Sequence, residues 1–345
     1  CVSTACTAQP EPNLLVRDDR AARSQAAVDE VVGRDTNPGC SAAVGERGEV
    51  LWRGHRGLAL VEPVTPISDD TTFDVGAISQ QFTALSVALL DQEGRLSVDD
   101  PLSKHLHGYP DWSHRVTISQ LIHHTSGIPD IEPLMRARGV WMETEATRAQ
   151  QLDAIADVPE LEAEPGTRWA YSGSNYLLLG VVVEKATGRP LADHLEQTFF
   201  APLALAISLT WPGAEDRTRS YRGQPDGRFE IHDLAWEGPG AAGIRTNPAE
   251  LVRWADVYRT GAIGGLLVTE PGRDAVDGAW DGSDYGLGIL IAPDQTLYHP
   301  GQVGGFRSLF GISADRQKTI AVSCNGVGYE PFDIVAPLIE IWAFR

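Results

Sequence analysis

Apolar residues recur with two periods along the chain, and these periods predict strands near both ends and helices between them. Alanine and valine at helical spacing predict an amphipathic helix over 19–32, and the patterns over 40–44 and 50–54 predict a β-hairpin. Further strands are expected over 285–291, 305–312 and 319–324. Further helices are expected over 145–155, 174–185, 190–200 and 331–344, and one that begins with Asn247 as cap and Pro248 in its first turn.

The order of these segments predicts an α+β fold. Strands from both ends of the chain would form one antiparallel sheet, with an all-helical region inserted between them. We expect a lead-in over 1–18, a sheet domain from 19–75 and 280–345, and a helical domain over 76–279.

The stretch 73–84 combines a strand-like approach, a glycine and the start of a buried helix. Apolar residues such as Ala77, Ala84 and Leu85 recur at helical spacing after Gly76. The first turn of a helix exposes free amides and the positive end of its dipole. We therefore expect this helix start to face a cleft.

Composition excludes several classes of partner. The chain has 345 residues, of which 42% are hydrophobic, so it can bury a sizeable core. Its formal net charge of −19 makes nucleic acid and anionic membranes poor partners. No apolar run approaches the roughly 20 residues needed to span a bilayer. A small molecule is the expected partner, and the oligomeric state is open.

The four cysteines show no metal-ligand spacing. Cys40 and Cys324 lie in apolar, strand-like contexts and are expected to be buried hydrophobic residues. Cys1 leaves a lipoprotein origin or a trimmed chain open, so the compartment is undecided. A loose histidine cluster over 105–114 lacks the carboxylate pattern of a metal site, and neither metal nor cofactor is expected.

Several segments resemble the serine β-lactamase and penicillin-binding protein superfamily, in its class C-like and esterase branch. The stretch 73–84 resembles the nucleophile segment, where the family has S-x-x-K and this chain has Ala77-Ile78-Ser79-Gln80. The segments 38–54, 94–102, 116–128 and 242–244 resemble other parts of the family's pattern. The resemblance runs from about residue 38 to the end of the chain and implies a three-layer α/β/α fold.

The resemblance also implies the site residues. Tyr171 matches the family's general acid–base tyrosine, whereas Gly173 stands where the family has an asparagine that recognises the substrate amide. The segment 299–306 resembles H-x-G-x-x-x-G-F, which the family places on an edge strand beside the substrate. The catalytic candidates are therefore Tyr171 and His299. The substrate-binding candidates are Ala77, Gln80, Trp169, Gly173, Gly301 and Phe306.

The substitutions in the S-x-x-K register argue against an acyl-enzyme. Acyl transfer needs an activated oxygen or sulfur nucleophile, and Ala77 has neither. The amide of Gln80 cannot accept a proton near neutral pH. Ser79 lies two residues on, roughly 200° around the helix, and should face away from the pocket.

Three hypotheses for function follow. We favour an atypical enzyme that transforms a small molecule by acid–base chemistry of Tyr171 and His299 without an acyl-enzyme. The first alternative is a pseudoenzyme that binds a ligand or a protein partner in the old cleft. The second is an inactivated mutant of a serine esterase or β-lactamase-type hydrolase. Substrate identity and reaction type stay open.

Overall fold

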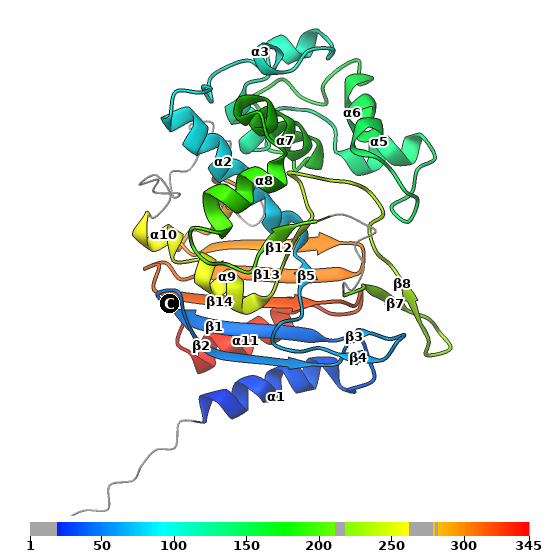
Figure 1. The fold of residues 1–345 in the computed structure, drawn as a ribbon, viewed down its shortest axis with the longest axis vertical. Helices are drawn as coiled ribbons and strands as arrows, with labels where there is room; N and C mark the ends of the chain where they lie inside the picture. The colour runs from blue at the N-terminus through cyan, green and yellow to red at the C-terminus, as the bar shows by residue number, and fades with distance from the viewer. Residues whose placement is uncertain (1–18, 211–217, 262–278, 280–281, 345) are drawn as a thin grey trace, which may run out of the picture.

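A computed structural model describes residues 19–210, 218–261, 279 and 282–344 of the chain (Figure 1). The expected lead-in over 1–18, including Cys1, lies outside the described residues. In the described part of the chain, no helix has the length and apolar character required to cross a membrane.

The centre of the fold is a seven-stranded antiparallel sheet in the order β10-β11-β12-β13-β14-β1-β2. Its strands are β1 Cys40–Glu46, β2 Glu49–Arg56, β10 Asp284–Tyr285, β11 Leu290–Ile291, β12 Leu297–Val303, β13 Phe306–Ile312 and β14 Lys318–Cys324. β1 pairs with β14 along its whole length, so strands from opposite ends of the sequence lie side by side (Figure 1). This pairing confirms the antiparallel sheet predicted from the order of the segments.

Helices cover both faces of the sheet. α1 (Arg20–Val32) and α11 (Pro331–Ile341) pack on one face, where apolar residues of both helices form a core with β1, β2 and β14. α9 (Pro248–Trp254) packs on the other face against β1, β14 and β2. The side chain of Asn247 caps α9 by accepting a hydrogen bond from the Glu250 amide at 3.0 Å, as the sequence predicted. A helix expected in the helical domain thus covers the sheet.

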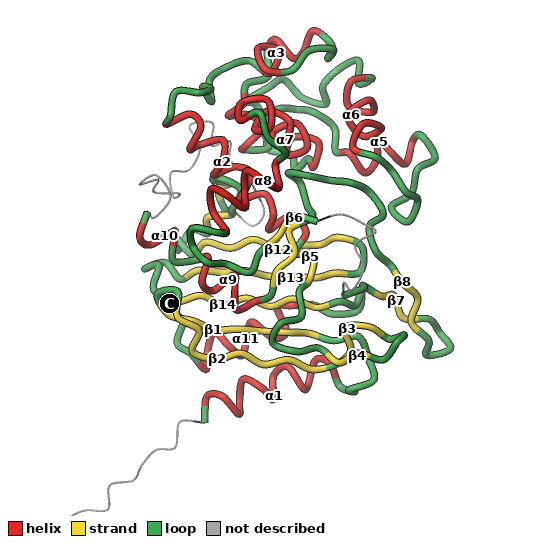
Figure 2. The backbone as a smooth tube through the Cα atoms, in the orientation of Figure 1, coloured by secondary structure: helices red, strands yellow, loops and turns green. Residues whose placement is uncertain are grey.

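The remaining helices gather above the sheet around the buried α2, which packs against α7 (Figure 2). They are α2 Gln80–Gln92, α3 Leu102–His105, α4 Ile118–Ile122, α5 Ile131–Ala137, α6 Arg148–Ala156, α7 Gly173–Thr187, α8 Leu191–Leu195 and α10 Val257–Thr260. Short turns of helix are η1 Gly76–Ser79, η2 Asp111–His114 and η3 Glu196–Phe200. Small strands are β3 Leu58–Leu60 with β4 Thr65–Pro66, β5 Phe73–Asp74 and β6 Ser208–Leu209 flanking β9 Ile244–Thr246, and β7 Tyr221–Gly223 with β8 Phe229–Ile231.

The strand predictions near the end of the chain need two corrections. The segment 285–291 is two short strands, β10 and β11, separated by a turn in which Gly288 has a φ of +70°. The strand that carries His299 is β12, which lies third from the sheet edge. β11 pairs only with Leu297 and Tyr298, so the rest of β12 has its sheet partner on the β13 side.

Cys40 and Cys324 form a disulfide across the β1–β14 pair. Both side chains are fully buried, as expected, and the bond between them is a feature that the sequence analysis did not predict. The strand register places the two cysteines directly opposite each other, with Cα atoms 4.0 Å apart. They are separated by 284 residues in sequence, so no local pattern could have paired them.

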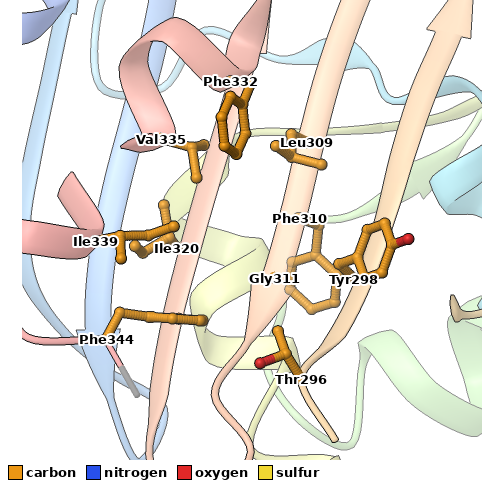
Figure 3. Close-up of a pocket in the computed structure, with 10 residues that line it drawn as sticks. All are labelled: Thr296, Tyr298, Leu309, Phe310, Gly311, Ile320, Phe332, Val335, Ile339 and Phe344. Atoms are coloured by element: carbon orange, nitrogen blue, oxygen red, sulfur yellow. The ribbon is translucent and has the colours of Figure 1, made fainter. Parts of the chain in front are cut away.

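An apolar groove lies between α11 and the strands β12 to β14 (Figure 3). Its volume is about 390 Å³, and its walls include Leu309, Phe310, Phe332, Val335 and Phe344. Phe332 is 60% exposed, which leaves the groove open at that side. Phe310, Ile320 and Val335 in its lining belong to the buried core, whereas Phe332 is exposed.

Candidate active site

Two glycines let β12 lie directly against the turn that carries Ala77. Gly76 has a φ of +55°, and a Cβ atom there would come within 2.8 Å of the Gln302 backbone nitrogen. A Cβ atom on Gly301 would lie 1.9 Å from the Val75 carbonyl oxygen. Gly301, expected to bind substrate, thus has a positioning role: it brings β12 to the start of the buried helix.

The turn is also held from its other side. The hydroxyl of Ser79 accepts a hydrogen bond from the Ile244 amide at 3.2 Å, and the Ser79 side chain is buried. This contact confirms that Ser79 faces away from the cleft. Asp74 accepts a hydrogen bond from the Gly76 amide at 3.0 Å. Burial raises the pKa of Asp74, while the Arg245 guanidinium acts in the opposite direction.

Gln80 is the centre of a buried polar network below Ala77. Its side-chain nitrogen donates to the Tyr171 hydroxyl at 2.7 Å. Its side-chain oxygen accepts from the Tyr285 hydroxyl at 2.7 Å and lies 3.1 Å from Nε2 of His124. Both ends of the amide are therefore engaged, and Gln80 has no exposed surface with which to contact a ligand directly.

His124 belongs to the network as a neutral imidazole. Its Nδ1 accepts a hydrogen bond from the Ser172 amide at 3.2 Å, so its Nε2 carries the proton that is donated to Gln80. Burial, together with the neighbouring His299 and His123, lowers its pKa well below the usual value. His124 therefore fixes the orientation of the Gln80 amide.

His299 lies beneath this network and is 1% exposed. Its Nδ1 donates to the Pro300 carbonyl at 2.6 Å, and its Nε2 lies 3.0 Å from the Tyr285 hydroxyl. Burial lowers the pKa of His299 to about 4. Since Tyr285 has one hydroxyl proton, it can donate a hydrogen bond to either Gln80 or His299 at one time, but not to both.

The sequence-based expectation that His299 and Tyr171 face one pocket needs correction. Among the described residues, His299 does not line either of the cavities beside Ala77. Burial alternates along β12, with His299 and Gly301 on the buried side and Pro300 and Gln302 on the accessible side. Hydrogen bonds connect His299 to Tyr171 through Tyr285 and Gln80.

Two adjoining cavities meet at Ala77 and Tyr171. We call the larger cavity, of about 460 Å³, the outer cavity and the smaller one, of about 160 Å³, the inner cavity, and these names refer to size alone. Both are also lined by Glu132, Met142 and Gln302. We call the two cavities together the cleft. Tyr171, a half-buried residue, therefore belongs both to the cleft and to the polar network, and burial raises its pKa.

Gly173 lines the inner cavity, where the resemblance placed an asparagine. Its amide donates to the Asp130 carboxylate at 2.6 Å, which fixes the start of α7. Burial raises the pKa of Asp130, and the amides that it accepts from act in the opposite direction. Position 173 therefore contributes a backbone amide to the start of α7 and has no side-chain amide to offer to a ligand.

Two other candidates support the site from behind. Trp169 is half-buried and packs its ring 6.1 Å from His124 and 6.2 Å from Tyr285. Phe306, expected to contact substrate, is 3% exposed and packs edge-on against Phe73 with ring centroids 6.4 Å apart. Phe306 is therefore a core residue of the neighbouring small strands.

Sequence analysis missed Tyr285, Arg222 and Arg307. Tyr285 was expected only as a strand residue, although a tyrosine just before a glycine-rich turn is a signal that could have been weighed. Arg222 and Arg307 line the outer cavity. Arg222 comes from the β7–β8 hairpin, which no apolar alternation predicted.

The described groups around Ala77 are poorly suited to accept a proton. The methyl group of Ala77 lies where the cleft meets the helix start, and the groups behind it are an amide, neutral imidazoles and tyrosines of raised pKa. None of these is an effective base near pH 7. The site can therefore hold a ligand, but it presents no nucleophile at this position.

The sheet, the helices inserted above it and the cleft at the start of a buried helix define a fold of the β-lactamase and transpeptidase class. The chain belongs to the β-lactamase family, because the family model described as Beta-lactamase matches residues 25–340.

Individual relatives agree with this membership. Protein flp of Staphylococcus aureus (strain COL) is 30% identical over 334 residues, which cover 88% of this chain and 63% of that protein. D-aminopeptidase of Gluconobacter oxydans (strain 621H) is 27% identical, with 89% of this chain and 59% of that protein covered. The chain therefore spans less than two thirds of the length of these relatives.

A solved structure supports the fold. The octameric penicillin-binding protein homologue from Pyrococcus abyssi superposes with a TM-score of 0.80 at 23% identity, covering 94% of this chain and 78% of that one. At this identity the likeness concerns the fold alone.

Proposed function

We propose that this protein binds a small molecule in the cleft and forms no acyl-enzyme. The observation that carries the proposal is the pair Ala77 and Gln80: a methyl group lines the cleft where a nucleophile would stand, and an amide fully engaged in hydrogen bonds lies behind it. The loss of the nucleophile and its base at these positions is part of the proposal.

The protonation states of Tyr171 and His299 favour binding over the acid–base chemistry expected from the sequence. Tyr171 accepts a hydrogen bond from Gln80, and its raised pKa keeps it protonated near pH 7. His299 is buried, and its pKa of about 4 keeps it neutral. Burial and the Asp130 carboxylate both raise the pKa of Tyr171, which disfavours its use as a base.

The first experiment looks for covalent chemistry. Purified protein is incubated with a fluorophosphonate and with benzylpenicillin, and its intact mass is measured. We expect no adduct, since Ser79 is buried and bonded to Ile244. An adduct on the unaltered chain would refute the proposal.

The second experiment looks for binding. A small-molecule library is screened by ligand-observed NMR against the wild type and Ala77→Leu, whose side chain fills part of the cleft without removing a hydrogen bond. Ala137→Leu, at an exposed site on α5, is the matched control. We expect ligands that bind the wild type and Ala137→Leu and not Ala77→Leu. Equal binding to all three would place the ligands elsewhere and refute the proposal.

An enzyme that uses Tyr171 as its acid is the second candidate. The observation in its favour is that the Tyr171 side chain lines both cavities. Each ligand found above is incubated with the protein and followed by mass spectrometry. Turnover that is lost in Tyr171→Phe with unchanged binding would favour this enzyme, whereas unchanged ligand favours the binding protein.

A further inference from the structure

The groove between α11 and the sheet is separate from the cleft. Among the described residues, none lines both the groove and the cleft. In Figure 3, Val335 and Ile339 of α11 lie on one side of the groove and Leu309 of β13 lies on the other. Phe332, also from α11, is 60% exposed, so the groove opens to solvent there. A molecule can therefore reach the groove without passing through the core.

Gly311 keeps the floor of the groove open. It lies inside β13, opposite Tyr298 of β12 and Ile320 of β14. Its φ lies outside the left-handed region, and the nearest atoms to a Cβ there would be the Leu297 carbonyl oxygen and Cζ of Phe344, both at an ordinary 3.8 Å. A glycine inside a strand weakens the strand, and it often marks the close approach of a ligand or another backbone. The described chain supplies no such backbone, which leaves a ligand as the physical reason for an open floor.

The wall of the groove is apolar. The ten residues that line it are uncharged, and their side-chain polar atoms are the hydroxyls of Thr296 and Tyr298. The Tyr298 hydroxyl lies 3.0 Å from that of Ser283, within hydrogen-bond distance. The wall therefore offers a ligand chiefly apolar contact.

The charged groups beside the groove do not favour an anion. Nζ of Lys318 donates to two carbonyls just beyond α11, at 2.9 and 2.6 Å. Nη1 of Arg316 donates to the carbonyl that precedes Thr296, at 2.6 Å, and to two others. The α11 carboxylates Asp333 and Glu340 line the neighbouring hollow between α1 and α11. Since the chain also has a net charge of −19, a neutral ligand suits the groove better than an anionic one.

The volume of the groove limits the size of its ligand. At about 390 Å³ it falls within the range of small-molecule pockets. It has about two and a half times the volume of an apolar cavity of roughly 150 Å³ that holds benzene, so two or three aromatic rings fit. One turn of helix, about 10 Å across and 5.4 Å long, would already fill it. Stable protein interfaces bury about 800 Å² on each partner, so the groove is of a size for a small molecule.

We propose that the groove is a second binding site, and that it takes the apolar part of a neutral small molecule, such as an aromatic ring system or an alkyl group of similar volume. Contact with α11 on one side and with the floor at Gly311 on the other removes apolar surface from water, and this burial provides the affinity. A charged substituent inside the groove would lose its hydration and gain no partner from the wall. The site is independent of the proposed function, which concerns the cleft.

The test uses two fluorescent probes that share one skeleton. N-phenyl-1-naphthylamine is neutral, and 8-anilinonaphthalene-1-sulfonate is the same molecule with an added sulfonate. Both emit more strongly in apolar surroundings, so titration gives their dissociation constants for the wild type, Gly311→Leu, Phe332→Ala and Ala77→Leu. Gly223→Leu is the matched control, because Gly223 is an exposed strand glycine whose Cβ would also meet its nearest neighbour at 3.8 Å.

We expect the wild type to bind the neutral probe about tenfold or more tightly than the sulfonate, because the groove cannot replace the hydration of the charge. Gly311→Leu fills the floor and should weaken binding of the neutral probe about tenfold or more. Phe332→Ala removes one wall at an exposed position and should weaken it by about threefold. Gly223→Leu and Ala77→Leu should bind the neutral probe as the wild type does. Melting temperatures show whether each variant is folded, and Phe332→Ala keeps the test decisive if Gly311→Leu is not.

The inference is overturned if the wild type does not bind the neutral probe, if it binds the sulfonate equally well, or if Gly311→Leu and Phe332→Ala bind as the wild type does. Loss of binding in Ala77→Leu alone would place the probe in the cleft and would also overturn it. Light scattering that shows a dimer of the wild type and a monomer of Gly311→Leu would mean that a second copy covers the groove, which contradicts a small-molecule site. None of these results bears on the proposed function, which the Ala77→Leu screen tests separately.

Discussion

Gln80 and Gln81 offer a matched test of the polar network. Both side chains are completely buried and each makes three polar contacts. Gln81 accepts from Trp254 and Tyr258, both at 2.7 Å, and donates to the Ile78 carbonyl at 3.1 Å. The perturbation is leucine at each position in turn, which keeps most of the volume and removes every hydrogen bond.

The two variants should lose different amounts of unfolding free energy, because the hydrogen-bond partners of Gln80 and Gln81 differ. Each lost hydrogen bond contributes about 1 kcal/mol, and each buried partner left without one adds about 1–3 kcal/mol. In Gln80→Leu, Tyr171 can bond water in the cleft and Tyr285 keeps His299, but Nε2–H of the buried His124 loses its acceptor. Three lost bonds and one stranded partner give an expected loss of about 4–6 kcal/mol. In Gln81→Leu, the indole of Trp254 and the hydroxyl of Tyr258 both lose their acceptor in the core. Three lost bonds and two stranded partners give an expected loss of about 5–9 kcal/mol.

The assay is urea unfolding followed by the fluorescence of the nine tryptophans, with ligand binding measured on the same samples. Gln81→Leu should be the less stable variant but keep ligand affinity, because Gln81 does not line the cleft. Gln80→Leu should be the more stable of the two and change affinity through Tyr171. The reasoning is refuted if Gln80→Leu matches the wild type within about 0.5 kcal/mol or is the less stable variant.

Three further predictions concern pH, the disulfide and the pair Ala77 and Gln80. His299 has a pKa of about 4 in the fold and about 6.5 in the unfolded chain, so its contribution to the unfolding free energy is complete above pH 6.5 and falls by about 3 kcal/mol as the pH drops to 4. In a plot of urea midpoint against pH, His299→Gln should flatten this fall. A variant curve that runs parallel to that of the wild type would contradict the assignment. Replacing Cys40 and Cys324 together by alanine removes a cross-link between residues 284 positions apart and should lower the unfolding free energy by on the order of 4 kcal/mol. Unfolding of the reduced wild type is a second measurement of the same effect. An unchanged unfolding midpoint in both would argue against the disulfide. Ala77→Ser with Gln80→Lys should not restore rapid hydrolysis of a chromogenic ester, because Gly173 still lacks a side-chain amide; rapid hydrolysis would favour the inactivated-mutant alternative.

Local patterns predicted much of the fold. The β1–β2 hairpin, α1 and the capped start of α9 each follow from residues close together in sequence. The antiparallel sheet followed from the order of these elements. The β-lactamase family followed from several segments that resemble the family's pattern, and the match of the family model to residues 25–340 confirms it.

The site was harder to predict because its geometry depends on distant segments. His299 was expected in the pocket, but the alternation of β12 turns it to the buried side. Tyr285 joins Gln80 and His299 across 205 and 14 residues of sequence. The disulfide depends on the register of β1 with β14. Such contacts arise from packing over long range, which spacing in one sequence does not encode.

The pairing of β1 with β14 has a consequence for synthesis of the chain. The β1–β2 hairpin leaves the ribosome early, but its sheet partner follows only after another 272 residues, counted from Glu46 to Lys318 (318 − 46). At about 5–20 residues per second, that interval is roughly 15 to 55 seconds. During this time β1 presents an unpaired apolar edge, and such edges attract other strands. We therefore expect the nascent chain to need chaperone protection until its last strands emerge, and truncated chains that end before β14 to aggregate.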